Sequence, residues 1–263
     1  MTHSAINPPR IFFIAICLAA CAPSSVLADH APPLSVSRVK AIIAAARPGA
    51  RPNLAGLRLA GFDLTGVNFR RANLASANLF EATLIAANLA GTTMDHANFS
   101  GVKMDHARAQ HASLRGAMLL TTASGANFEA ADLSRVSGYL IAPGSNLRDA
   151  VLAHARLGSD LSNQPMGLLH TIFSHADLAG ADLSFADLSF ADLGYASFRR
   201  AIVRAVNFRG ADLSGADFSR ADVTNANFAN ADLAGTIFIG VRGRSSMKGL
   251  GNARNLDQAI FRR

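Results

Sequence analysis

Two identical Asp-His pairs are the residues whose types best suit chemistry in this chain of 263 residues. Asp95-His96 and Asp105-His106 each follow a methionine and stand ten residues apart. An imidazole beside a carboxylate can bind a metal ion or take part in proton transfer. Further histidines occur at His111, His154, His170 and His175. Whether any of these groups can act together depends on the elements that position them.

Other motifs with catalytic spacing are missing from the sequence. The glycine-bearing stretch 240–251 does not have the spacing of a phosphate-binding loop, and a basic turn is the better interpretation. Asp192, Asp212 and Asp232 recur at a regular interval, which indicates a structural position in a repeat. We therefore predict no catalytic residue, no metal site and no cofactor.

A five-residue repeat fills most of the chain. Residues 176–195 are four consecutive units that each begin Ala-Asp-Leu. Each unit has a small residue, then Asp or Asn, then a central Leu or Phe, then two variable residues. From Leu54 to Phe238 there are about 34 such units, in frames that shift between 120 and 167.

The composition follows the repeat. Half of the residues are hydrophobic and 51 are alanine, yet only 7% are aromatic. A chain so rich in apolar residues is not disordered, because disordered chains are poor in them. The scarcity of bulky side chains also argues against an ordinary enzyme with a deep, aromatic-lined pocket.

A period of five fits neither a strand nor a helix. Successive central residues would fall on opposite faces of a strand and would drift by about 140° per unit around a helix. A chain that turns one corner in each unit keeps every central residue inside. The residue two before it also points inward and the other three point outward, so that Leu188 should be buried and Ser189 exposed. We therefore predict an all-β solenoid in which each coil covers its neighbours.

The pattern Ala-(Asp/Asn)-(Leu/Phe) with two variable residues resembles the pentapeptide-repeat family over roughly residues 52–240. This resemblance implies a right-handed quadrilateral β-helix with four units in each coil, and thus eight to nine coils. Residues four units apart should then stack. Interior aromatic ladders are expected from Phe198, Phe218 and Phe238, and from Phe208 and Phe228.

The same spacing decides how the Asp-His pairs are interpreted. Ten residues are half a coil, so Asp95-His96 and Asp105-His106 should face opposite sides of the rod. His111 lies a quarter-coil from His106, and the later histidines also fall at outward positions. Solvated surface histidines are therefore the better interpretation.

We divide the chain into six segments. Ser35–Ala46 has apolar residues at helical spacing, and we expect a short N-terminal capping helix there because solenoids need covered ends. The expected segments are a signal peptide (1–28), a linker with the capping helix (29–51), a first repeat block (52–133), irregular loops with a few repeats (134–167), a second repeat block (168–240) and a C-terminal tail or cap (241–263).

The N-terminus has the features of an export signal. A ten-residue apolar run, Ile11–Ala20, follows the basic Arg10 and is too short to span a bilayer. Val26-Leu27-Ala28 reads as a cleavage site before Asp29. Leu18-Ala19-Ala20-Cys21 also resembles the lipobox of bacterial lipoproteins, in which the cysteine is lipidated. The protein is therefore expected to be periplasmic or extracellular after cleavage at Ala28, or anchored to the membrane through Cys21.

Two surface features are candidates for an interaction site. Phe185, Phe190 and Tyr195 occupy the same outward position in three consecutive units and would form an aromatic belt, unless they pack only onto their outward neighbours. Basic residues form a second candidate, either an anion-binding surface or a solubilising face, at Arg199, Arg200, Arg204, Arg209 and Arg220.

The charge and the export signal narrow the function. Some cytoplasmic members of the family mimic DNA and protect DNA gyrase, but that role needs an acidic rod, and this chain carries a formal charge of +7. A non-enzymatic exported scaffold or binding protein of the bacterial envelope is the leading hypothesis, with an unknown protein or an anionic envelope polymer as partner. Nucleic acid is disfavoured by the compartment. The alternative is an enzyme acting on polysaccharide, for which the interruption supplies only Arg148, Asp149, His154, Arg156 and Asp160.

Overall fold

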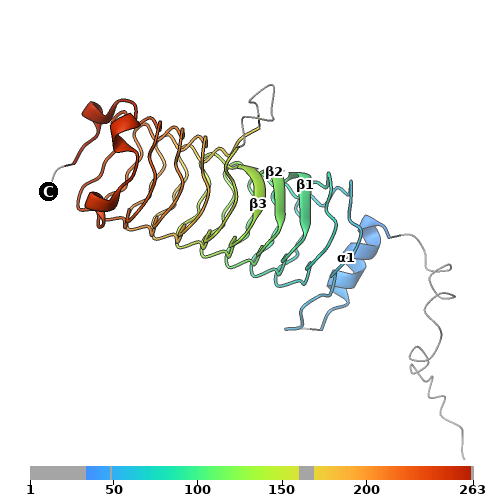
Figure 1. The fold of residues 1–263 in the computed structure, drawn as a ribbon. Coiled ribbons are helices and arrows are strands. Elements are labelled where there is room, and N and C mark those ends of the chain that lie inside the picture. Colours follow the sequence, from blue (N-terminus) through green and yellow to red (C-terminus); the bar gives the residue numbers. More distant parts are fainter. Residues whose placement is uncertain (1–33, 48, 160–168, 262–263) are drawn as a thin grey trace, which may run out of the picture. The chain divides into compact units, whose positions relative to one another are not determined.

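From residue 34 onward the chain forms a stack of coils with a helix at its beginning (Figure 1). The computed structural model describes residues 34–47, 49–159 and 169–261. Helix α1 (Val36–Ala44) is followed by β1 (Asn98–Lys103), β2 (Met118–Thr122) and β3 (Ser137–Ile141), which pair in parallel in that order. Three 3-10 helices come last, η1 (Arg244–Ser246), η2 (Leu250–Asn252) and η3 (Leu256–Gln258).

Single parallel bridges between successive coils build most of the stack. Each coil has four bridged positions, which define faces 1 to 4; in the first coil they are Asn53, Arg58, Asp63 and Asn68. We call the corners after these faces A, B, C and D. Face 1 links ten levels, through Asn53, Asn73, Thr93, Ser113, Asp132, Val151, Asp182, Ile202, Asp222 and Arg242. The predicted parallel β-solenoid is thus confirmed, with more coils than the eight to nine expected.

Backbone hydrogen bonding explains the residue types of each unit, as Ala72–Ser76 illustrates. The N–H of Asn73 donates to the coil before it, those of Leu74 and Ser76 donate to the coil after it, and that of Ala72 closes a turn onto Phe69. The N–H of Ala75 has no backbone acceptor and donates instead to the side-chain Oδ1 of Asn73, 3.1 Å away. Asp or Asn is favoured at that position because its short side chain accepts this bond.

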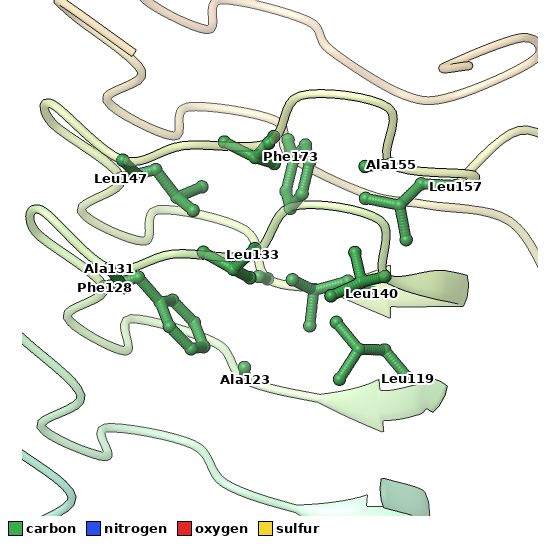
Figure 2. Close-up of a cluster of buried hydrophobic side chains, with 14 of the residues drawn as sticks. Leu119, Ala123, Phe128, Ala131, Leu133, Leu140, Leu147, Ala155, Leu157 and Phe173 are labelled. Carbon is green, nitrogen blue, oxygen red and sulfur yellow. The ribbon is translucent and has the colours of Figure 1, made fainter. Parts of the chain in front are cut away.

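The interior is filled by the central residues and by the small residues two before them. Leu74, Leu79, Ala72 and Ala77 are all buried, and the same pattern continues along the stack. Figure 2 shows this packing between Leu119 and Phe173. Only a narrow space is left once four large side chains enter each coil, which is why the second inward position is alanine.

Both expected aromatic ladders are present. Phe198 stacks on Phe218 with ring centroids 4.5 Å apart, and Phe218 stacks on Phe238 at 5.2 Å. Phe208 lies on Phe228 at 5.4 Å, and rings of the two ladders meet edge to face. These arrangements are the favourable ones for aromatic pairs.

The structure corrects the prediction of irregular loops for residues 134–159, the described part of the segment 134–167. Bridges continue through residue 156, and β3 forms inside this segment. Bridge partners such as Asn127↔Asn146 stand one residue closer in sequence than those of a regular coil, because β2 and β3 pass corner B as continuous strands. Ala123 and Ala142 are buried central residues of this shifted frame.

One coil is longer than the rest. The bridge partners from Ile141↔Ile172 to Arg156↔Asp187 stand much farther apart in sequence than those of a regular coil, so the extra residues follow Ser159. Leu168, counted as a central residue from the sequence, lies outside the described residues. Ser189 is only 7% exposed, contrary to the prediction, because Gly158 and Ser159 of the preceding coil lie against it.

Each end of the stack has its own cover. In the predicted capping helix, the Ser35 side chain accepts a hydrogen bond from the N–H of Arg38, and Val39 is fully buried. At the other end, each of the last three sides is one residue longer than a side of a regular coil. The last bridges therefore fall at Lys248, Arg254 and Ile260. Phe261 stacks on Phe238 at 5.0 Å and ends the aromatic ladder.

We expect Leu183→Asp to destabilise the solenoid severely, by about 4 kcal/mol or more, because it places an unpaired carboxylate in the interior. Ser184→Asp in the same unit is the matched control and should cost about 0.5 kcal/mol or less, since that side chain points outward. Chemical unfolding followed by circular dichroism measures both. Similar losses for the two variants would contradict the inward and outward assignment.

Candidate functional site

The last residue of most units sits at a corner in the left-handed backbone conformation. His96, Phe185 and Tyr195 all have φ near +60°. Their side chains lean toward the same corner of the next coil. A Cβ built on Gly116 would lie 2.8 Å from the His96 ring, and one on Gly215 would lie 2.6 Å from the Tyr195 ring. Corner side chains therefore form columns along the stack, and at Gly116 and Gly215 a side chain would collide with the ring that leans over it.

The three predicted aromatic residues belong to one coil but to three different corners. Phe185 at corner A stacks on His154 with centroids 5.1 Å apart, and 60% of it is exposed. Tyr195 at corner C stacks on His175 at 5.1 Å and is 65% exposed. Phe190 at corner B is partly covered and lies over Gly210. They surround the coil, as expected, but do not form a single patch.

The five predicted arginines do not share one face either. Arg200 and Arg220 lie at corner D of successive coils, as their spacing predicts. Arg199 at the same corner pairs with Asp217 at 3.0 Å. Arg204 lies at corner A and pairs with the buried carboxylate of Asp222 at 2.8 Å, whereas Arg209 lies at corner B. Two of the five therefore have structural partners.

A groove at corner A brings together residues that the sequence analysis had treated separately. It has a volume of about 680 Å³. Phe185 from the aromatic belt and His154 and Arg156 from the interruption all line it. The remaining lining residues are Arg135, Ser137, Ala155 and Asp187.

Two further cavities adjoin this groove through shared arginines. Arg135 also lines a cavity of about 450 Å³ that continues along corner A to Asp95, His96 and Arg115. Arg156 also lines a cavity of about 410 Å³ that extends across face 2 to Leu120 and Tyr139 at corner B. We call the three cavities together the face 2 groove.

Charges in the face 2 groove are unevenly paired. Arg115 pairs with Asp95 at 2.7 Å and faces Asp132 at 3.8 Å. Burial alone would raise the pKa of Asp95, but hydrogen bonds from Ser113 and Arg115 and the charge of Arg115 lower it. Arg135 and Arg156 are exposed, and no carboxylate among residues 34–159 and 169–261 forms an ion pair with either. The middle of the groove thus offers two guanidinium groups to a ligand.

Asp187 is the one carboxylate among the residues that line that middle section. Its Oδ1 accepts hydrogen bonds from the Ser189 N–H and the Asn207 amide, both at 3.0 Å. This oxygen therefore stabilises the coil itself, as the side-chain oxygens of Asp and Asn do at the equivalent positions of other units.

The residues named for a polysaccharide enzyme separate into two groups. Arg148 and Asp149 lie at corner D, where Arg148 pairs with Asp177 at 3.1 Å, whereas His154 and Arg156 lie in the face 2 groove. Asp160 lies outside the described residues, as do Cys21, Ala28 and Asp29.

The Asp-His pairs do not meet. His96 and His106 occupy corners A and C, on opposite sides as expected. Within the described part of the chain, no three His, Cys, Asp or Glu residues cluster to hold a metal ion. In the same residues, no helix is long and apolar enough to cross a membrane.

Sequence reasoning missed Arg135, Ser137 and Asp187. The corner residues His96, Arg135, His154 and Phe185 lie above one another on successive or nearby coils. Counting the sequence with a fixed coil length does not bring them into line, because two of the coils between them are shorter than a regular coil and one is longer. The frame shift after Leu119 was the available signal, since realigning the units beyond it places these residues at one corner.

Comparisons with known proteins agree with this architecture. A model of the family described as "Pentapeptide repeats" matches eight copies, at residues 53–84, 82–119, 173–204 and 204–240. No curated protein matches the chain.

The solved structures that resemble this chain include a protein described as a pentapeptide repeat protein. HetL of the cyanobacterium Nostoc sp. strain PCC 7120 is described as a pentapeptide repeat protein involved in heterocyst differentiation regulation. It is 27% identical, with a TM-score of 0.50, over 87% of this chain and 95% of its own. QnrB1, described as a plasmid-mediated fluoroquinolone resistance protein, is 17% identical with a TM-score of 0.41, over 76% and 89% of the two chains.

We expect Arg204→Gln to lower the melting temperature at neutral pH by about 2–4 °C, because it removes the partner of a buried carboxylate. Burial alone would raise the pKa of Asp222, but hydrogen bonds from Thr224 and Arg204 and the charge of Arg204 lower it. The stabilisation is therefore present above the ordinary carboxylate pKa and is lost as pH falls below it. Thermal scans from about pH 7 down to about pH 2 should show the difference from the unmodified protein shrinking with acid.

Arg209→Gln is the control for that measurement, since Arg209 is exposed and forms no ion pair with the described residues. A constant difference across the pH range for Arg204→Gln would contradict the pairing.

Gly210→Ala should destabilise the protein by more than the roughly 1 kcal/mol that a left-handed alanine costs. The new Cβ would lie 2.5 Å from Phe190 Cε1, at a position where φ is +67°. In a Phe190→Ala background only the backbone cost should remain. A double-mutant cycle of unfolding free energies measures the coupling, and a coupling of zero would show that Phe190 does not cover this corner.

Proposed function

Because the chain belongs to the pentapeptide-repeat family, we propose that it is a scaffold that is exported to the bacterial envelope and binds its partner through its outer surface. Membership of this family supports the role of a repeat scaffold that is not an enzyme. Membership also implies that the four-faced coil is right-handed.

The face 2 groove is the observation that carries this proposal. Inward positions of the coil are occupied by the core, and the Asp or Asn positions accept backbone hydrogen bonds. The residues that recognise a partner must therefore stand at the outward positions of the units. In the groove, Arg135 is the last residue of its unit, and Arg156 replaces the usual Asp or Asn of its unit. Both arginines lack ion-pair partners among the described residues and lie beside the exposed Phe185.

The N-terminal sequence supports export. A basic leader, a ten-residue apolar run and a small-residue cleavage site precede Asp29. Lipidation of Cys21 is the alternative processing, and it would keep the scaffold at a membrane surface.

Other functions have less support. A polysaccharide-cleaving enzyme would need a convergent carboxylate or Arg/Lys site on one face. The described residues named for it are divided instead, with Arg148 and Asp149 at corner D and His154 and Arg156 in the face 2 groove. Protection of DNA gyrase by mimicry of DNA would require an acidic surface, and this chain has a formal charge of +7.

Intact-mass analysis of the protein purified from envelope and cytoplasmic fractions tests the export part of the proposal. We expect a chain that begins at Asp29, or one that begins at a lipid-modified Cys21, in the envelope fraction. Substituting Cys21 with Ser should remove the lipidated form and leave the cleaved form unchanged. A chain that retains Met1 and stays in the cytoplasm would contradict the proposal.

A further inference from the structure

We propose that the face 2 groove binds a linear acidic polysaccharide, with carboxylate groups held by Arg135 and Arg156 and sugar rings lying on Phe185 and Tyr139. This inference rests on the proposed function, since it names the class of ligand that the exported scaffold would bind.

The two arginines are placed to meet a ligand that carries repeated charges. Arg135 and Arg156 belong to successive coils, which are joined by a hydrogen bond from the Gly138 N–H to the Arg156 carbonyl, 3.1 Å long. Neighbouring levels of a parallel sheet lie about 4.8 Å apart. Guanidinium groups bind carboxylates through two parallel hydrogen bonds, so each arginine can hold one acidic group of a chain that crosses both levels.

Aromatic rings stand on both sides of these charges. Phe185 and His154 form a stacked pair at corner A, and Phe185 is 60% exposed. Tyr139 lies in β3 at corner B, beside Leu120 and Arg156 in the adjoining cavity. The C–H faces of sugar rings pack on aromatic faces, and their hydroxyl groups tolerate an open, hydrated groove. The alternation of ring, arginine and ring therefore suits a chain of acidic sugars.

The backbone argues against an acidic peptide as the occupant. A bound peptide strand usually gains affinity by pairing with a free sheet edge. On face 2 both neighbours are already taken, because Ser137 bridges Arg156 and Arg156 bridges Asp187. Recognition in this groove is left to side chains, which is sufficient for a polysaccharide.

The length of the groove favours a polymer over a small anion. Its three cavities lie along corner A and across face 2, and neighbouring ones share Arg135 or Arg156 as a lining residue. A chain that fills several of them binds through many weak contacts at once.

Binding of oligogalacturonate, a linear chain of uronic acids, to the mature protein tests the inference. In titrations at moderate salt, we expect the double variant Arg135→Gln/Arg156→Gln to bind about tenfold more weakly or worse. Arg209→Gln/Arg220→Gln is the matched control, because it removes the same charge from exposed residues outside the groove. It should change affinity by less than about twofold.

The aromatic contacts are tested in the same assay. Phe185→Ala and Tyr139→Ala should each weaken binding, whereas Tyr195→Ala, which removes a similarly exposed ring at corner C, should not. Circular dichroism confirms that each variant keeps its fold. A neutral dextran of equal length should not bind measurably.

Several results would overturn the inference. Equal losses for the two arginine pairs would mean that binding follows net charge rather than the groove. Equal affinity of poly-glutamate with the same dependence on Arg135 and Arg156 would make the occupant a peptide. If no uronic-acid chain binds while mass analysis places the protein in the envelope, the groove assignment fails and the exported scaffold stands. If the groove binds but the protein keeps Met1 in the cytoplasm, export fails instead.

Discussion

The fold requires that every peptide N–H of a five-residue unit has a hydrogen-bond acceptor. In the unit Ala72–Ser76, three donors are satisfied by neighbouring coils, one by the turn and one by the Asn73 side chain. An unsatisfied buried N–H would cost about 1–3 kcal/mol, and the cost would recur at each unit. The same residue types therefore recur along the chain. Core packing adds the second requirement, since only alanine fits beside Leu or Phe in so narrow an interior.

These requirements explain which features the sequence could predict. The five-residue period follows directly from the turn in each unit, so the solenoid, the buried centres and the Phe198–Phe218–Phe238 ladder were predictable. The continuity of 134–159 was not, because Ala123 and Ala142 occupy central positions without the bulk that identifies one. A coil side that has only four residues cannot be recognised from the sequence. It becomes apparent only in the structure, where the strands β2 and β3 pass corner B without a turn.

The candidate site was predictable only in part, for the same reason. Phe185, His154 and Arg156 were each singled out from the sequence, but their proximity depends on the shortened and lengthened coils. The regular coils place arginines such as Arg199 and Arg204 next to repeat carboxylates, which neutralise them. The same pairing persists in the lengthened coil, where Arg148 meets Asp177. Arg135 is the last residue of its unit and Arg156 stands where other units have Asp or Asn, and neither has an ion-pair partner in the described part of the chain. The position of an arginine within its unit thus decides whether a repeat carboxylate neutralises it.

The widening of the last coil has a consequence for how copies of the protein meet. Its bridged residues, Arg242, Lys248, Arg254 and Ile260, are six residues apart, whereas those of the first coil are five apart. An exposed sheet edge normally templates further strands. The preceding coil, with sides of five residues, still bridges the last coil on all four faces, and the extra residues form the 3-10 helices η1, η2 and η3 at three corners. Irregular backbone of this kind at a sheet edge is one of the ways in which proteins keep the edge from pairing with another chain.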